Sequence, residues 1–230
     1  MGEFFSWQRV FENFPRLIVK LPITFEIVVI AFAVGLTLGI ILSFVELKRI
    51  PVLTQVLDVF ISFERGTPLL VQMLVMYYGL PLVLEGLFGI DTRGWEKLTF
   101  VIITYTLNQA AFLSQDFRGA ILSIPAGQRE AALACGLTPF QTAVRIVLPQ
   151  SVRVAVPSIG LELIGLFQNT SLVSMVGVID ILGRAQSLGN LTSHTFESYL
   201  IVAFVFVVIS LLLTALNKAI NARLKSEVIK

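Results

Sequence analysis

The sequence predicts an all-α integral membrane protein with five transmembrane helices, and three observations lead to this fold class. Of the 230 residues, 56% are hydrophobic and 14% are charged, whereas a soluble domain is about half apolar and about a quarter charged. Apolar runs recur along the chain at lengths that suit a spanning helix, which needs about 20 mostly apolar residues. No internal repeat or low-complexity region divides the chain, so the spans form one domain.

Composition also excludes several classes of function. The net charge of +2 is small and spread along the chain, which argues against a nucleic-acid interface. Cys135 is the one cysteine and His194 the one histidine, so neither an intrachain disulfide nor a zinc site with several such ligands can form. We expect Cys135 to be a small packing residue and His194 to be an inert loop residue.

Residues 1–19 are predicted to form an amphipathic segment. Aromatic residues recur there at spacings of three and four, with charged residues between them: Phe4, Trp7, Phe11 and Phe14, and Arg9, Glu12 and Arg16. Such a helix suits the membrane interface, and packing against the other helices is an equally good interpretation. The segment lacks the basic stretch and short apolar run of a cleaved signal, so we expect it to be retained.

The first two predicted spans differ in continuity. The first runs from Pro22 to Glu46, where Gly35 and Gly39 form a small-xxx-small pair that permits close approach of another helix. The second is apolar before and after the interruption "ERGTP" at 64–68. Two short apolar pieces around a Gly/Pro break fit one kinked or interrupted helix better than two full spans.

Three further spans complete the predicted transmembrane domain of residues 20–220, and a basic tail follows at 221–230. These spans cover 98–117, 153–178 and 199–216, with polar loops at 85–97 and 180–197. The span over 153–178 is unusually polar, because it contains Ser158, Glu162, Gln168, Asn169, Thr170, Ser171 and Ser174.

The distribution of basic residues predicts the orientation. Lysine and arginine number ten in the turn at 48–49, the region 118–153 and the C-terminal residues 218–230, and six in the connections on the opposite side. This bias places the C-terminus in the cytoplasm and the N-terminus outside, and an odd number of spans is consistent with termini on opposite sides.

The segment 125–149, on the predicted cytoplasmic side, is expected to contain two short helices. Pro125 opens the first, whose alanine-rich residues favour helix, and Gly136 ends it in the left-handed cap conformation. Thr138 begins the second as an N-cap with a capping box, and we expect this helix to end before Pro149. A surface connector and a docking element for a soluble partner are equally good interpretations of these residues.

The spacing within this segment is E-A-A-x3-G-x9-I-x-L-P, carried by Glu130, Ala131, Ala132, Gly136, Ile146, Leu148 and Pro149. It resembles the signature of the membrane subunits of bacterial binding-protein-dependent ABC importers. The stretches "RGTPLLVQMLVMYYGLP", "FRGAILSIPAGQREAA" and "QNTSLVSMVGV" are similar to those of polar amino-acid importer permeases. The resemblance covers about residues 20–220.

This resemblance implies a type I ABC importer permease fold and a set of partners. A second permease subunit, the same or homologous, and two cytoplasmic ATPase subunits would assemble with this chain, and an extracytoplasmic solute-binding protein would deliver the amino acid for alternating access. The chain has no G-x-x-x-x-G-K-[ST] loop, so ATP and Mg²⁺ would lie on the ATPase and the chain itself needs no cofactor. The residues implied to couple to the ATPase are Glu130, Ala131, Ala132, Gly136, Leu137 and Thr138.

Glu162 is the main candidate for substrate binding, because an ionisable group within a span is costly unless it is paired or faces a wet cavity. Ser158 lies one turn before it, and the polar run from Gln168 through Asn169 and Thr170 to Ser171 suits a pocket or an irregular turn. The family commonly has asparagine where this chain has Leu161, and lysine where it has Gln168. Without that lysine, Glu162 is either protonated, or paired with a substrate ammonium, or paired with Arg65. A structural hydrogen bond between helices is the alternative role.

Arg65 has two interpretations: it binds a substrate carboxylate, or it stabilises the kink by pairing with Glu64. The family carries basic, acidic, amide and sulfur-containing amino acids, and Gln168 together with "RIPVLTQVL" at 49–57 is most similar to cystine-type members. A self-powered secondary transporter or channel is the alternative function, although such folds usually show repeats and more spans. A membrane enzyme ranks third, since no nucleophile motif occurs.

Overall fold

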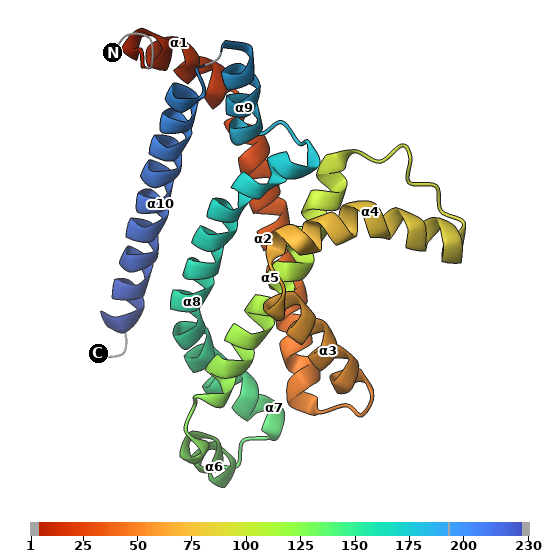
Figure 1. The fold of residues 1–230 in the computed structure, drawn as a ribbon. Coiled ribbons are helices and arrows are strands. Elements are labelled where there is room, and N and C mark those ends of the chain that lie inside the picture. The colour runs from red at the N-terminus through yellow and green to blue at the C-terminus, as the bar shows by residue number, and fades with distance from the viewer. Residues whose placement is uncertain (1–4, 193, 227–230) are drawn as a thin grey trace.

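The computed structural model describes residues 5–192 and 194–226, and every regular element in them is helical (Figure 1). Phe4 of the aromatic stripe and Lys230 of the basic tail lie outside these residues. In chain order the elements are α1 (Trp7–Ile18), α2 (Leu21–Lys48), α3 (Leu53–Gly66), α4 (Leu69–Phe88), α5 (Lys97–Leu122), α6 (Ala126–Ala134), α7 (Pro139–Thr142), η1 (Ala143–Val147), α8 (Leu148–Asn169), η2 (Thr170–Val176), α9 (Ile181–Thr192) and α10 (Thr195–Ser226).

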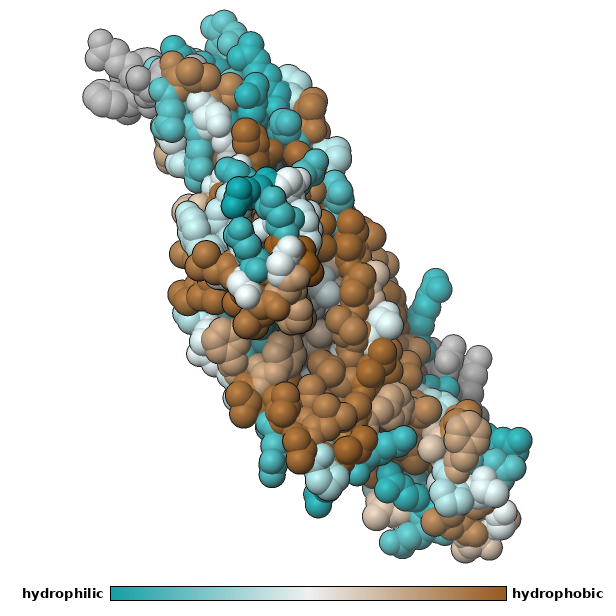
Figure 2. Space-filling view, turned by 90° about the vertical axis from the view of Figure 1, so that its right-hand side faces the viewer, coloured by the Kyte–Doolittle hydropathy of each residue, from teal (hydrophilic) through white to brown (hydrophobic). Residues whose placement is uncertain are grey.

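Four helical stretches within the described residues are long and apolar enough to cross a membrane: 21–48, 69–88, 139–176 and 195–224. Figure 2 shows a broad band of hydrophobic side chains across the middle of one face, with hydrophilic ones toward the two ends. The third predicted span, 98–117, lies within α5, a 26-residue helix that is not among these four. Its composition is too polar for this criterion because α5 lies at the centre of the bundle, where half of its residues are buried.

The small residues predicted for close packing are at the contact between α2 and α5. A Cβ atom added at Gly35 would lie 2.7 Å from the Cβ of Gln109, and one added at Gly39 would lie 2.9 Å from the Cβ of Leu113. Such distances leave no room for a side chain, so the prediction of a close helix approach is confirmed.

The interruption at Thr67-Pro68 separates α3 from α4, as predicted for the second span. The amide nitrogen of Gln72 donates to the carbonyl oxygens of Glu64 (2.6 Å) and Thr67 (3.0 Å), and Asn108 on α5 donates to the Gln72 amide oxygen (3.0 Å). Within the described residues no ion pair joins Arg65 to Glu64, so the interpretation of an Arg–Glu pair holding the kink is wrong. Gln72 instead satisfies the carbonyl groups that the break leaves free.

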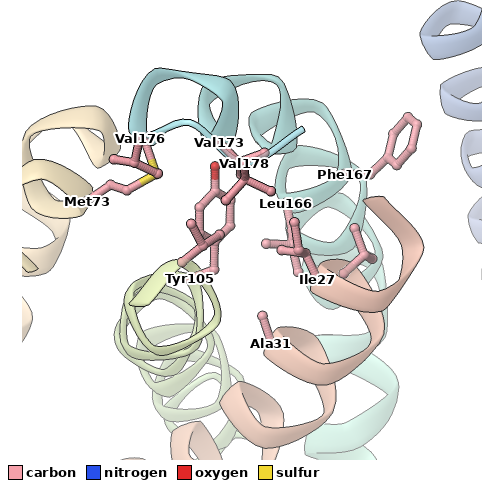
Figure 3. Close-up of a cluster of buried hydrophobic side chains, with 11 residues drawn as sticks. Ile27, Ala31, Met73, Tyr105, Leu166, Phe167, Val173, Val176 and Val178 are labelled. Atoms are coloured by element: carbon pink, nitrogen blue, oxygen red, sulfur yellow. The ribbon is translucent and has the colours of Figure 1, made fainter. Parts of the chain in front are cut away.

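A cluster of buried hydrophobic side chains joins α2, α4, α5, α8 and η2 (Figure 3). The Tyr105 ring extends from α5 into this cluster, and its hydroxyl donates to the carbonyl oxygen of Asn169 at 2.6 Å. Phe167 points from α8 toward α10 in Figure 3, where its ring stacks on Phe206 with centroids 4.9 Å apart. These contacts fix the point at which α8 gives way to the 3₁₀-helix η2.

The second helix of the segment 125–149 does not end at Leu148, contrary to the prediction. α7 continues through the π-helix η1 directly into α8, and Pro149 lies in the first turn of α8. A proline ring clashes with the carbonyl four residues earlier in a regular α-helix. The wider π turn just before Pro149 is the local change that accompanies this proline, so the helix continues.

The loop predicted at 180–197 contains a helix, α9, that periodicity did not reveal. Asp180 is its N-cap: one carboxylate oxygen accepts the Gly183 backbone N–H at 2.8 Å. Asp180 is fully buried, and burial raises its pKa to about 6 although the Gly183 N–H opposes the shift. Other predicted boundaries were too narrow, since α4, α5 and α10 all extend beyond the apolar runs.

Candidate functional site

The helix α6 and the turn after it form the predicted coupling segment, at the end of the bundle opposite the N-terminus (Figure 1). Gly136 has φ +84°, the left-handed conformation predicted for the turn. Thr138 accepts the Gln141 backbone N–H through its hydroxyl, and the Gln141 side chain accepts the Thr138 N–H (3.2 and 2.9 Å), so the predicted capping box is present. Pro125 is the N-cap residue of α6 rather than its first helical residue.

The coupling segment presents two charged residues, Arg129 and Glu130, and an apolar ridge outward. Glu130, Ala131 and Thr138 are exposed and Leu137 is half-buried, whereas Ala132 is buried against the bundle. Phe140 is 77% exposed and Leu133 is 43% exposed. Behind α6, an apolar cavity of about 280 Å³ separates it from the ends of α2 and α5. A short rigid helix with exposed apolar residues at the end of a membrane bundle is suited to contact another protein.

Three ionisable side chains, from α3, α5 and α8, lie near one another. Glu162 on α8 and Asp116 on α5 are half-buried, and Arg65 on α3 is exposed. The three are close enough to interact electrostatically. The Arg65 guanidinium also lies 5.4 Å from the centre of the Phe112 ring, which orients its charge.

Glu162 makes no hydrogen bond or ion pair within the part of the chain that the structure describes, which removes the support for a purely structural role. Ser158 precedes it by one helical turn on the same face of α8. Asp116 was missed by the sequence analysis, because it lies at the predicted end of a span, where a charge needs no special explanation. One of its oxygens is buried without a partner. The rule that singled out Glu162 applies equally to Asp116.

The polar residues 168–171 that follow Glu162 make hydrogen bonds to other groups and not to Glu162. The Gln168 amide donates to the Ser210 hydroxyl on α10 at 3.2 Å, and the Asn169 carbonyl accepts from Tyr105. The Thr170 hydroxyl donates to the Phe167 carbonyl at 2.7 Å, and the Ser171 hydroxyl donates to the Gln168 carbonyl at 2.9 Å. The structure therefore brings Glu162 and Arg65 together but does not bring Gln168 to them.

Arg65 also lines a polar cavity of about 300 Å³ among α2, α3 and α5. Glu46 is buried there and accepts two hydrogen bonds of 2.9 Å from the Gln115 amide, while the Arg118 guanidinium lies 3.9 Å from it. Asp58, Ile61 and Ser62 complete the lining. This cavity is lined by charges of both signs, and Arg65 belongs both to its lining and to the Glu162 group. No group of three or more potential metal ligands occurs within the described residues.

Comparison with known proteins agrees with this arrangement. Residues 35–226 match the family described as binding-protein-dependent transport system inner membrane component. The chain is 34% identical over 227 residues to the L-cystine transport system permease protein TcyL of Bacillus subtilis (strain 168), covering 99% of this chain and 95% of that protein. It is 34% identical over 213 residues to the arginine transport system permease protein ArtQ of the same strain, covering 93% and 94%.

The fold is similar to a chain in the crystal structure of "an amino acid ABC transporter with histidines". The TM-score is 0.86 at 26% sequence identity, covering 95% of this chain and 99% of that one. ATP in such transporters is bound by a partner ATPase, and the permease carries no cofactor. The chain therefore belongs to the family of binding-protein-dependent transport system inner membrane components, as a non-catalytic, multi-pass permease of an amino-acid ABC importer.

Proposed function

We propose that this chain carries a polar amino acid across the cytoplasmic membrane by alternating access, in a complex with a second permease subunit and two ATPase subunits. Five helical passes cross the membrane in this proposal: α2, the broken pair α3–α4, α5, α8 and α10. The interior position of α5 explains its polar composition, since a helix covered by other helices needs no lipid-facing surface. A solute-binding protein delivers the amino acid on the side of α1.

The orientation proposed from the basic residues agrees with the arrangement of the chain. The N-terminus and α6 lie at opposite ends of the bundle (Figure 1), as the three proposed passes between them require. We place α6 and the C-terminal end of α10 in the cytoplasm and α1 outside. The exposed ridge of α6 would then meet the ATPase, with contacts from Glu130, Ala131, Ala132, Gly136, Leu137 and Thr138.

The proposed substrate site centres on Glu162, with Ser158, Arg65 and Asp116 around it. A carboxylate pair suits the ammonium group of an amino acid, and the guanidinium of Arg65 suits its carboxylate. One observation carries this proposal. Glu162, Asp116 and Arg65 come from three helices and lie close together, and Glu162 makes no hydrogen bond within the described residues. The run Gln168, Asn169, Thr170 and Ser171 would form the irregular turn on the route to this site.

L-cystine is the single substrate that we propose, on two features of this chain. Gln168 is uncharged where family members commonly have lysine, and residues 49–57 are similar to those of cystine-type members. Relatives of equal identity are named for cystine and for arginine, so identity alone does not choose between them. Titration of the cognate solute-binding protein with cystine, arginine and glutamate tests this choice directly, and preference for another amino acid would replace cystine.

Transport by the reconstituted complex tests the function. Proteoliposomes that contain this permease, its ATPase and its binding protein are expected to take up the amino acid only with ATP. Uptake by this chain alone, without ATP, would establish the secondary transporter or channel instead. Glu162→Gln is expected to lower uptake at least tenfold or to change selectivity, as loss of about 1.4 kcal/mol of binding or more implies. Glu26→Gln, an exposed carboxylate on α2, is the matched control and is expected to transport normally.

A further inference from the structure

An apolar groove lies between α1 and the first turns of α10, far along the chain from the substrate and coupling residues. Its volume is about 600 Å³, within the range of about 300–1,000 Å³ typical of clefts that hold small molecules. All of its lining side chains are hydrophobic: Trp7, Val10, Phe11 and Phe14 from α1, and Leu200, Ile201 and Phe204 from α10.

Contacts along one side of α1 fix its position beside α10, so the groove is present without a bound ligand. The backbone N–H of Ser6 donates to the buried carboxylate of Glu197 at 3.0 Å, and the Asn13 amide donates to the Ser198 hydroxyl at 3.4 Å. Leu17 is fully buried in a cluster that includes residues of α9 and α10. The other side of α1 therefore extends away from α10. Trp7 and Phe11 lie on it and are 65% and 75% exposed.

The position of the groove places it in one leaflet of the bilayer. α1 lies across the end of α10 (Figure 1), and its polar face carries Arg9, Glu12 and Arg16. The lining residues of α10 at 200–204 are about 8 to 14 Å from the beginning of that helix, at 1.5 Å per residue. The hydrocarbon of one leaflet is about 15 Å deep, half of the bilayer core.

We propose that this groove binds one acyl chain of a phospholipid in the leaflet nearest the N-terminus. The acyl chain would enter beneath α1, lie against Leu200 and Phe204, and leave the groove toward the middle of the bilayer. Its headgroup would lie level with α1, where Arg9 and Arg16 outnumber Glu12 and complement a phosphate. The aromatic side chains Trp7 and Phe11 cover the chain from above, in the position that amphipathic aromatic anchors take at a membrane surface.

Fluorescence of Trp7 tests this site directly. In a Trp95→Phe background Trp7 is the one tryptophan, and the variant is reconstituted in vesicles of phosphatidylcholine whose acyl chains carry bromine. Bromine quenches tryptophan on contact. We expect loss of most of the Trp7 emission when the bromine is near the headgroup end of the chain, and a smaller loss when it is near the methyl end.

Two matched variants separate the groove from ordinary lipid contact. Phe204 and Leu211 lie on the same helix and are 62% and 63% exposed, but Phe204 alone lines the groove. Phe204→Gln is expected to reduce the quenching of Trp7, whereas Leu211→Gln and Phe204→Leu are expected to leave it unchanged. Equal quenching in all three variants would overturn the groove as a lipid site.

The occupants other than lipid give different results. If a second permease subunit covered the groove, neither brominated lipid nor aqueous iodide would quench Trp7. If α1 stood in water, iodide would quench Trp7 and brominated lipid would not. Either result overturns the proposal, and neither depends on transport activity, so the proposed function is tested separately.

Discussion

The amide nitrogen of Gln72 lies 2.6 Å from the carbonyl oxygen of Glu64, across the break between α3 and α4. A broken helix within a membrane leaves carbonyl groups without water to bind them, and each unsatisfied group costs several kcal/mol. Gln72 supplies the missing donor from the next helix, and Asn108 fixes its orientation. The break is therefore a stable feature of the second pass rather than a flexible joint.

Gln72→Leu is expected to destabilise the protein by about 2–3 kcal/mol, because the Thr67 carbonyl loses this donor and the Glu64 carbonyl and the Asn108 amide keep only the long hydrogen bond of 3.4 Å between them. The thermal unfolding midpoint of the purified protein in detergent measures this loss. Gln128→Leu makes the same exchange on the exposed surface of α6 and is expected to leave the midpoint unchanged. Equal midpoints for the two variants would mean that Gln72 does not stabilise the break.

Gly39→Ala is expected to destabilise the protein by about 1–3 kcal/mol, the usual range for overpacking. The added Cβ would lie 2.9 Å from the Cβ of Leu113 and 3.1 Å from the backbone nitrogen of Ser114, so α2 and α5 would have to separate. Gly119→Ala is the control, because nothing lies within 4 Å of a Cβ at that position on α5. It is expected to be neutral or slightly stabilising, as alanine favours helix. Thermal unfolding of both variants compares them, and a stable Gly39→Ala protein would disprove the close contact.

The sequence predicted the helical class, the broken second pass and the glycine turn after α6, because each depends on a local rule. A Gly/Pro interruption, a left-handed glycine and a capping box are all encoded within a few residues. The meeting of Asp116 with Glu162 and Arg65 depends on how three helices pack, which one sequence does not contain. α9 escaped prediction because its apolar positions are few, although Asp180 followed by Gly183 was available as an N-cap signal.

The continuation of α7 into α8 was missed for a different reason. Pro149 is a helix breaker in the local rule, but the π turn over 143–147 widens the coil ahead of it. A helix that ends before Pro149 and a helix that continues past it are therefore both compatible with these residues. Contacts with the rest of the bundle select the continuous helix. Buried Val147 is one such contact.

Stability is expected to depend on Asp180 below neutral pH. Its pKa is raised to about 6 in the folded protein by burial, above the usual value of about 3.9 in an unfolded chain. The folded state therefore binds more protons between these values, and the contribution of Asp180 to stability falls as the pH rises from about 4 to about 6. Above pH 6 the buried carboxylate is ionised in both states and this contribution is at its lowest.

Asp180→Asn removes the titration and keeps an oxygen to accept the Gly183 N–H. Thermal unfolding midpoints of the two proteins are measured from about pH 4 to about pH 7, because this range includes both the unfolded and the folded pKa of Asp180. The difference between variant and parent is expected to favour the variant increasingly as the pH rises from about 4 to about 6, and to level off above that. A difference that does not change with pH would show that Asp180 is not desolvated.

Gly136→Asp and Glu130→Ala are expected to uncouple ATP hydrolysis from transport while the permease still inserts and assembles. At φ +84° a residue with a side chain costs about 1–2 kcal/mol, and this strain would redirect α6 relative to the ATPase. Glu130→Ala removes the exposed negative charge of α6 without a change of backbone. Stimulation of ATPase activity by the loaded binding protein, measured in proteoliposomes, reports the coupling.

Gly127→Ala is the control, because Gly127 lies on the same helix with open space around it. This variant is expected to keep full stimulation. If Gly136→Asp and Glu130→Ala also keep it, α6 is a connector between passes and the ATPase contacts must be sought elsewhere on the same face.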